Sequence, residues 1–451
     1  MKKTLISLTL LALAGVAAGG YWMLREPPPQ WTTDSPEALA EFQRGFDAES
    51  KIYRAEAKEH FVRAAELDPD FLIAKLHQAM YEEKPERERL RAELAAADRG
   101  RLNSQERFLL DHWLARTAPD TPEREPAEIL DAFLAENPDN FHGLRYRCEG
   151  HWQAQDWDPA ESCYQRLLEL HPNWVRAQNF LGYIAMARGR FSEAEERFST
   201  YRYIAPDQAN PHDSMAELLI TLGRYEEAEA SLRKAIGIKP DFCHAYELRA
   251  QIGLFTSRFD IVEKALEDHG SFEACKRTVE YGYSCMMSAS VRYYGGDAEG
   301  AWEAIDGDCL ERRQGVDLTA HRVAVMTGRT DRALEMEDLL GQRREQALEE
   351  SRPDDTQYYD ASLAHMEGIR ALAGGNTARA VELLSKADKL LGYLGGERAA
   401  FKLFHRLDLL HALELAGEKA AAEALRRKIE AVNPRLLQDV QLRDLDQLTA
   451  G

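Results

Sequence analysis

The stretch NWVRAQNFLGYIAMARGRFSEAEERFSTYRYIAP, residues 173–206, decides the fold. Its first half repeats apolar residues with the 3.6-residue period of an amphipathic helix, at Trp174, Ala177, Phe180, Leu181 and Ala185. A glycine turn at Gly189 follows, and a second helix carries Ala194 and Phe198 before Pro206 ends the unit. The stretch is therefore predicted to be a pair of antiparallel helices.

This unit recurs along the chain at a fixed interval. Pro138, Pro172, Pro206 and Pro240 follow one another at equal spacing. A fixed period of about 34 residues is the signature of stacked helix–turn–helix repeats, in which each repeat buries surface against its neighbours. A stacked array also explains how 451 residues can fold without an obvious internal linker.

The residues of these units resemble the tetratricopeptide repeat. The best matching unit has Leu181-Gly182, Ala194, Phe198 and Pro206. The next unit has Gly223, Tyr225, Ala228, Ala235 and Pro240, and the first has Gly45, Ala57, Phe61, Ala64 and Pro69. The resemblance implies an all-α fold, a right-handed α-solenoid of about eleven antiparallel helix pairs, and a concave groove that binds a protein or peptide partner.

The match is strongest in the middle of the chain. We expect a solenoid over residues 35–270, with its best-registered repeats at 139–240, and degenerate helical repeats with a closing C-terminal helix over 271–451. In the degenerate part, turns between paired helices are predicted around Gly295-Asp297, Gly328-Arg329, Gly374-Asn376 and Gly417-Lys419.

The N-terminus has the pattern of a targeting segment. Lys2 and Lys3 precede an uncharged run over residues 4–24, which is long enough to span a bilayer as a helix. Residues 1–25 are therefore predicted to be a membrane anchor or a cleaved signal peptide, and both alternatives remain open. A proline-rich spacer at 26–34 follows. In either case the solenoid is exported, to the periplasm if the host is bacterial.

Composition and motifs argue against several functions. The formal net charge of −20 repels phosphate backbones, so nucleic acid is not an expected partner. The sequence has no Gly-rich phosphate loop, no G-x-S-x-G elbow and no H-E-x-x-H pair. We therefore predict no catalysis, no cofactor, no metal site and no small-molecule substrate.

The six cysteines suggest disulfides, because export permits them and their number is even. The repeat register places Cys148 and Cys163 on facing helices of one unit. It likewise brings Cys285 near Cys309, and it sets Cys243 beside Cys275 at the starts of successive units. Three disulfides are predicted; the alternative is that these residues are buried free cysteines acting as small apolar side chains.

The first helix of each unit should present one stripe to the concave side. We call the members of that stripe the predicted groove residues: Arg145, Trp152, Arg176, Asn179, Tyr183, Asn210, Asp213, Glu217 and Glu247. Aromatic and arginine side chains dominate protein-binding surfaces, which favours a peptide groove over a merely hydrated face. The acids in the stripe argue against a clamp for a C-terminal carboxylate.

Two functions remain as hypotheses. The favoured one is an exported, membrane-tethered scaffold that binds a protein or peptide and catalyses nothing. The alternative is an accessory or catalytic module of an envelope enzyme complex, with a site in the degenerate region 260–355. An extracytoplasmic sensor is disfavoured, because only three residues precede the apolar run.

Overall fold

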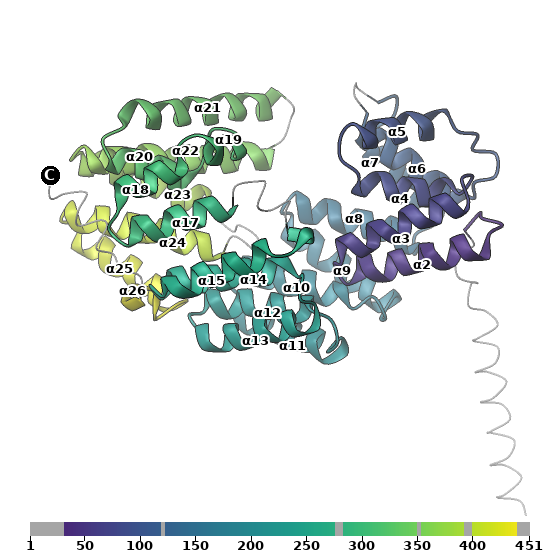
Figure 1. The fold of residues 1–451 in the computed structure, drawn as a ribbon, viewed down its shortest axis with the longest axis horizontal. Helices are drawn as coiled ribbons and strands as arrows, with labels where there is room; N and C mark the ends of the chain where they lie inside the picture. Colours follow the sequence, from purple (N-terminus) through teal and green to yellow (C-terminus); the bar gives the residue numbers. More distant parts are fainter. Residues whose placement is uncertain (1–30, 119–121, 276–282, 350–352, 392–398, 440–451) are drawn as a thin grey trace, which may run out of the picture. The chain divides into compact units, whose positions relative to one another are not determined.

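A computed structural model describes residues 31–118, 122–275, 283–349, 353–391 and 399–439. Within these ranges the chain is all-helical, with 24 α-helices, one short 3-10 helix and no strand. Consecutive helices fold back on each other as helix hairpins along most of the chain (Figure 1). The expected all-α fold is therefore confirmed.

The decisive stretch forms one such hairpin, from α10 (Arg176–Ala187) and α11 (Phe191–Ile204). The turn between them uses Gly189, whose φ of 69° lies in the left-handed region that glycine adopts readily. Close packing explains the mid-helix glycine, because a Cβ added at Gly182 would lie only 2.5 Å from the ring of Phe198. The small and large residues identified in the sequence thus meet across the hairpin.

Chain contacts divide the molecule into two compact units. Among the described residues, the first comprises those within 31–49 and 54–137, and the second those within 50–53 and 138–439. The main boundary between the two units follows residue 137. The sequence analysis placed the change from regular to degenerate repeats at residue 270, and that boundary stays a prediction.

The first unit contains six of the described helices. They are α2 (Pro36–Ser50), α3 (Arg54–Leu67), α4 (Leu72–Tyr81), α5 (Glu86–Ala96), α6 (Ser104–Arg116) and α7 (Pro126–Glu136). Its core includes Phe42, whose ring lies 5.6 Å from that of Phe61 and 4.8 Å from that of Phe71. A capping box starts α6: the Asn103 side chain accepts from the backbone N–H of Glu106, and Glu106 accepts from that of Asn103.

The second unit continues the helix pairs of the decisive stretch on both sides. Around α10 and α11 lie α8 (Phe141–Gln153), α9 (Trp157–Leu170), α12 (Asn210–Thr221), α13 (Tyr225–Ile238), α14 (Cys243–Phe255), α15 (Phe259–Gly270) and the 3-10 helix η1 (Glu273–Cys275). Ala194 and Phe198 are fully buried, as are Ala228 and Leu232 at the equivalent positions of the next repeat. The repeat thus recurs in packing as well as in sequence.

The second unit then continues through the degenerate region. Its helices are α17 (Tyr283–Tyr294), α18 (Ala298–Ile305), α19 (Asp308–Arg312), α20 (Leu318–Met326), α21 (Thr330–Glu349), α22 (Pro353–Ala373), α23 (Thr377–Leu390), α24 (Ala399–Leu415), α25 (Lys419–Glu430) and α26 (Leu436–Asp439). Four turns use glycines with positive φ at the predicted places: Gly296, Gly328, Gly375 and Gly417. Helix pairing persists here although the sequence signature fades.

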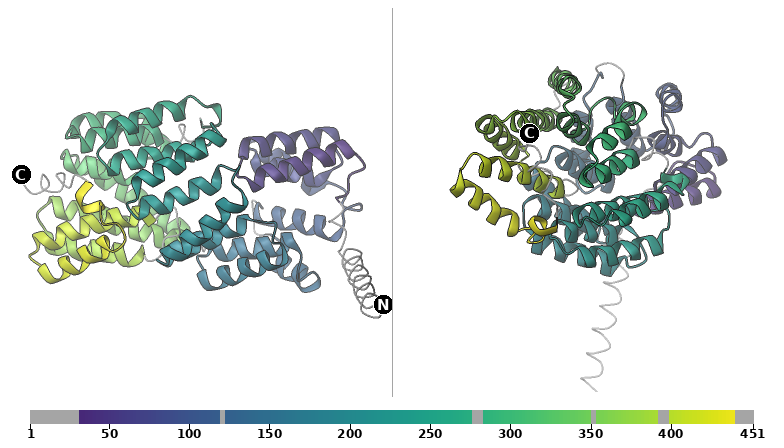
Figure 2. Two further views of the ribbon diagram at one scale, coloured as in Figure 1. Left: turned by 90° about the horizontal axis from the view of Figure 1, so that it is seen from below. Right: turned by 60° about the vertical axis from the view of Figure 1, so that its left-hand side comes forward.

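The C-terminal end of this unit returns to an earlier repeat. Asn433 is fully buried, and its Nδ2 donates to the Tyr225 hydroxyl at 3.1 Å and to the Ile220 carbonyl at 3.4 Å. Arg435 pairs with Glu226 at 2.7 Å. Figure 2 shows the C-terminal helices, drawn in yellow, beside the α12–α13 pair. Segments far apart in the chain are thus joined by specific polar contacts.

All six cysteines form disulfides in the structure, in the pairs expected from the repeat register. Cys148–Cys163 joins α8 to α9, with the two Cα atoms 5.3 Å apart. Cys243–Cys275 joins α14 to η1, and Cys285–Cys309 joins α17 to α19.

The predicted N-terminal anchor or signal at 1–25, and most of the spacer at 26–34, lie outside the described residues, as does most of the predicted closing helix after residue 439. Among the described helices, none combines the length and apolar character needed to cross a membrane.

Candidate binding groove

The predicted groove residues lie on four helices of the second unit: α8, α10, α12 and α14. The repeat period places them at equivalent positions of successive repeats, as with Tyr183 and Glu217. The structure adds their burial and their partners. Arg145, Asn179, Tyr183, Asn210, Asp213 and Glu217 are buried, whereas Trp152, Arg176 and Glu247 are partly exposed.

Several of these side chains bind each other between neighbouring repeats. The hydroxyl of Tyr183 on α10 donates to the carboxylate of Glu217 on α12. Burial, reinforced by the nearby carboxylates of Glu217 and Asp213, holds the pKa of the Tyr183 phenol well above its usual value. The phenol therefore stays protonated and keeps donating.

A second contact links α12 to α14. Nδ1 of His244 lies 2.7 Å from Oδ2 of Asp213. Burial alone would lower the pKa of His244, but the charge of Asp213 and its hydrogen bond outweigh burial and raise that pKa well above its usual value. Asp213 therefore favours the protonated form of His244, whose side chain is 39% exposed.

Three further groove residues, Asn210, Arg145 and Glu247, each have a polar partner nearby. Asn210 donates to the Tyr201 hydroxyl at 3.3 Å. Arg145 lies with Nε 3.6 Å from Glu149. Glu247 turns toward α15, where its Oε1 is 3.4 Å from Nε2 of His269.

Trp152 is packed more closely than a free groove aromatic would be. Its ring makes edge contacts with Trp157 at 5.6 Å, Phe180 at 5.3 Å and Tyr183 at 6.3 Å. It thus joins the aromatic core between α8 and α10, and only part of it is available to a partner.

Arg176 differs from the other charged members. Its guanidinium lies over the ring of Phe180, 5.4 Å from the ring centroid. Its Nε is buried without a hydrogen-bond partner, and no carboxylate of the described residues lies within ion-pair distance, 4.0 Å, of this guanidinium. The structure therefore positions a partly exposed cation on α10, and its terminal amino groups have no acceptor among the described residues.

Sequence reasoning missed a second polar region, in the C-terminal half. Glu337 on α21 binds His321 at 2.9 Å and receives two hydrogen bonds from Arg370, at 2.9 and 2.8 Å. Although burial alone would raise the pKa of Glu337, these two partners lower it below the usual value. The carboxylate therefore remains charged and paired within the fold.

A related cluster centres on Asp408 of α24. It accepts hydrogen bonds from Arg322 and, at 2.7 Å, from Nε2 of His365. Although burial alone would raise the pKa of Asp408, Arg322 and His365 lower it far below its usual value. Burial and the adjacent His365 keep the pKa of His405 well below its usual value. These clusters join α20, α21, α22 and α24, and their charged groups are engaged with each other.

A hollow of about 370 Å³ lies between α11, α12 and α13, and it too was missed. Arg202, His212, Arg224 and Lys234 line it together with Glu195, among others. Arg224 is held by Glu195 at 2.7 Å, so the lining is of mixed charge. The lining therefore does not present the uniform charge expected of a site for a ligand of opposite charge.

Comparison with known proteins agrees with this fold. Residues 185–252 match the family model described as tetratricopeptide repeat. No match was found among curated proteins.

Three solved structures illustrate the similarity. A tetratricopeptide repeat protein from Parabacteroides merdae is 16% identical, with a TM-score of 0.40, covering 59% of this chain and 98% of its own. Yeast Tom70 is 15% identical, with a TM-score of 0.43, covering 91% and 93%. The Cut9–Hcn1 hetero-tetramer of APC/C gives 12% identity and a TM-score of 0.49, covering 92% and 76%. The expected resemblance to tetratricopeptide repeats is confirmed by the matched segment.

Proposed function

We propose that this tetratricopeptide repeat protein is a non-catalytic, exported scaffold that binds a protein or peptide along α8, α10, α12 and α14. The full proposal is a right-handed solenoid of about eleven helix pairs behind an N-terminal apolar helix that tethers it to the membrane. The repeat fold supports protein binding, because stacked repeats offer an extended surface for a partner.

Arg176 is the observation that carries the binding surface. A guanidinium offers five N–H donors, and a partly buried one without an acceptor is costly to maintain. Stacking on Phe180 fixes its plane and limits its rotamers. A partner's backbone carbonyl or acidic side chain would supply an acceptor for the terminal amino groups.

The neighbouring contacts suit this role. Asp213 binds His244 of α14, and Glu217 of α12 fixes Tyr183. Arg176 and His244 therefore lie on the helices to either side of α12. An extended segment crossing these helices would meet polar groups whose orientation is already set, which lowers the entropy cost of binding.

The experiment is selection of peptides from a random library against the purified chain, followed by affinity measurement with variants. Arg176→Ala should weaken the selected peptides by about 10- to 100-fold, because a hydrogen bond to a charged group contributes about 1.5–3 kcal/mol. Arg233→Ala is the matched control, since Arg233 is an exposed arginine on α13. Equal affinities for wild type and Arg176→Ala would reject this surface.

Export and tethering are tested separately. A periplasm-active reporter fused after Gly451 should be active and a cytoplasm-active reporter inactive, because Lys2 and Lys3 precede a single apolar run. The reverse result would reject export. The mass of the mature chain then separates a retained anchor from a cleaved signal.

The catalytic alternative gains no support from the contacts in the degenerate region. His321, Glu337 and Arg370 bind one another inside the fold, which fits a structural network. Nucleic acid remains an unexpected partner on the grounds of charge.

A further inference from the structure

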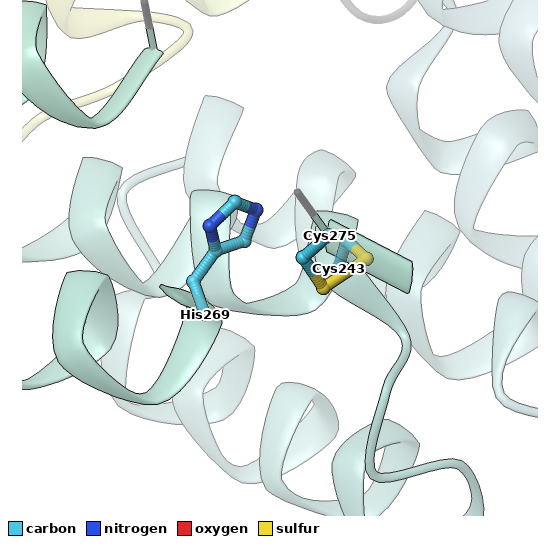
Figure 3. Close-up of side chains that lie close together, drawn as sticks. All are labelled: Cys243, His269 and Cys275. Carbon is cyan, nitrogen blue, oxygen red and sulfur yellow. A yellow bond between two sulfur atoms is a disulfide. The ribbon is translucent and has the colours of Figure 1, made fainter. Parts of the chain in front are cut away.

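The Cys243–Cys275 disulfide has a histidine beside it. The sulfur atoms of both cysteines and an imidazole nitrogen of His269 all lie within 4.8 Å of one another. Figure 3 shows the His269 ring next to the disulfide. Among the described residues, this is the group in which three metal-binding side chains come this close.

The three side chains come from different elements. Cys243 begins α14, His269 lies in the last turn of α15, and Cys275 ends η1. His269 is 1% exposed and Cys275 fully buried. Helices α14 and α15 pack on each other through Ala250, Val262 and Ala265, so the fold holds Cys243 and His269 on neighbouring helices, and the disulfide adds Cys275.

A carboxylate lies beside the histidine of this group. Glu247 lies one helical turn after Cys243, so the two share a face of α14. Its Oε1 is 3.4 Å from Nε2 of His269. Two sulfurs and one imidazole are thus gathered, and a carboxylate contacts the imidazole.

We propose that the reduced chain binds one Zn²⁺ through Cys243, Cys275 and His269, with the carboxylate of Glu247 rotating in as the fourth ligand. A dithiol reductant would first open the disulfide, taking up the oxidation as its own disulfide and leaving two protein thiols. Zn²⁺ then binds both sulfurs as thiolates and releases two protons. The proposal stands apart from peptide binding and from export.

Zinc suits this donor set. Its structural sites are tetrahedral and take thiolate, imidazole and carboxylate ligands, with Zn–S of about 2.3 Å and Zn–N of about 2.0 Å. Two sulfurs on one tetrahedral zinc stand about 3.8 Å apart, against about 2 Å in a disulfide. Each sulfur therefore needs to move by only about 1 Å, which side-chain rotation can supply.

The exchange would preserve a structural connection. The disulfide links α14 to η1 across 32 residues of sequence. A zinc ion held by the same cysteines closes the same loop, so this part of the repeat stays tied in both oxidising and reducing surroundings.

Cobalt titration of the full-length chain, in mild detergent, tests the site. The protein is made by cell-free synthesis under reducing conditions and kept reduced with a phosphine, which competes weakly for metal. Reduced wild type should bind one Co²⁺ with the thiolate charge-transfer and tetrahedral d–d absorption bands, and Zn²⁺ should displace it. The oxidised chain should show neither.

Variants assign the ligands. Cys243→Ser and His269→Gln should weaken Co²⁺ binding by about 100-fold or more, as loss of a ligand or its support does. The double variant Cys148→Ser/Cys163→Ser is the matched control, and its binding should equal that of wild type. Circular dichroism checks that each variant keeps its helices.

A wild-type measurement avoids any folding question. Zn²⁺ should slow alkylation of Cys243, the partly exposed cysteine of the site, in the reduced chain, while the partly exposed Cys163 and Cys285 react at an unchanged rate. Absence of Co²⁺ binding by the reduced wild type, unchanged binding in both single variants, or protection of other cysteines instead would each overturn the proposal.

Discussion

Replacing Gly182 by alanine should destabilise the hairpin of α10 and α11, although alanine is the better helix former. The added Cβ would lie 2.5 Å from Cε1 and 2.8 Å from Cδ1 of Phe198, well inside the carbon–carbon contact distance of about 3.5–4.0 Å. The ring must therefore retreat by about 1 Å. It has little room to do so, because Phe198 is fully buried and its ring centroid is 5.1 Å from that of Tyr183.

Two opposing terms set the magnitude. Overpacking a close-packed core costs about 1–3 kcal/mol. Alanine in place of a mid-helix glycine returns about 0.5–1 kcal/mol. The overpacking term is larger, so Gly182→Ala should lower the local stability by about 1–2 kcal/mol.

Gly341→Ala is the matched control. Gly341 lies inside α21, and an added Cβ there would meet no atom within 4 Å. Only the helix term then applies, so this variant should gain about 0.5–1 kcal/mol. The two substitutions are chemically identical, and the structure predicts that one lowers the local stability and the other raises it.

Hydrogen exchange of amides in α10, α11 and α21 measures these effects locally, which suits a repeat protein that need not unfold in one step. A double variant tests the cause. Phe198→Leu should cost clearly less in the Gly182→Ala background than in wild type, because the smaller side chain relieves the overlap. A neutral or stabilising Gly182→Ala, or strict additivity with Phe198→Leu, would refute the packing argument.

Three further outcomes are expected. Removing the Cys148–Cys163 disulfide by double serine substitution should destabilise α8 and α9 by about 3 kcal/mol in the chain-entropy model, since the loop spans 15 residues; hydrogen exchange measures it, and an unchanged exchange rate would contradict it. Asn433→Ala should cost about 1–3 kcal/mol and speed exchange in α25 and α26, because it removes the buried amide that binds the α12–α13 turn. Burial lowers the pKa of His112 to about 4 in the folded chain, against 6.5 in the unfolded chain. As pH falls from 6.5 to 4, the unfolded chain takes up a proton at His112 that the folded chain does not, so the free energy of unfolding decreases over this range. Urea titrations across this range should show the loss in wild type and a weaker one in His112→Gln; identical pH profiles would exclude this histidine as the source.

The sequence was most informative where local chemistry recurs at a fixed spacing. Gly189 predicted its turn because a left-handed position strongly favours glycine, and Gly182 with Phe198 predicted a close helix approach. The same register predicted the disulfide pairs, since the repeat period fixes which helix faces meet. These inferences need only neighbouring repeats.

Contacts over longer distances were not accessible in this way. Asn433 binds the turn near Tyr225, which lies many repeats earlier in the chain, and no period connects the two. His269 reaches Cys243 and Cys275 from a separate helix, so a search for closely spaced ligand motifs passed over it. The position of Trp152 in the repeat predicted a ring exposed in the groove. The ring instead packs against Trp157 and Phe180, because a residue at the edge of the groove-facing side can also reach the neighbouring helices.

The repeat geometry also explains why Arg176 in particular is left without an acceptor. Two of the predicted groove residues form a hydrogen bond with a residue of the next repeat: Tyr183 with Glu217, and Asp213 with His244. The residue equivalent to Arg176 in the next repeat is Asn210, whose amide donates to Tyr201 and which carries no charge. Pairing between neighbouring repeats therefore joins α10 to α12 and α12 to α14 at these two contacts, and it does not extend to Arg176. A cation maintained at such a break is explained by a partner that supplies the acceptor, and the comparison of Arg176→Ala with Arg233→Ala tests that explanation directly.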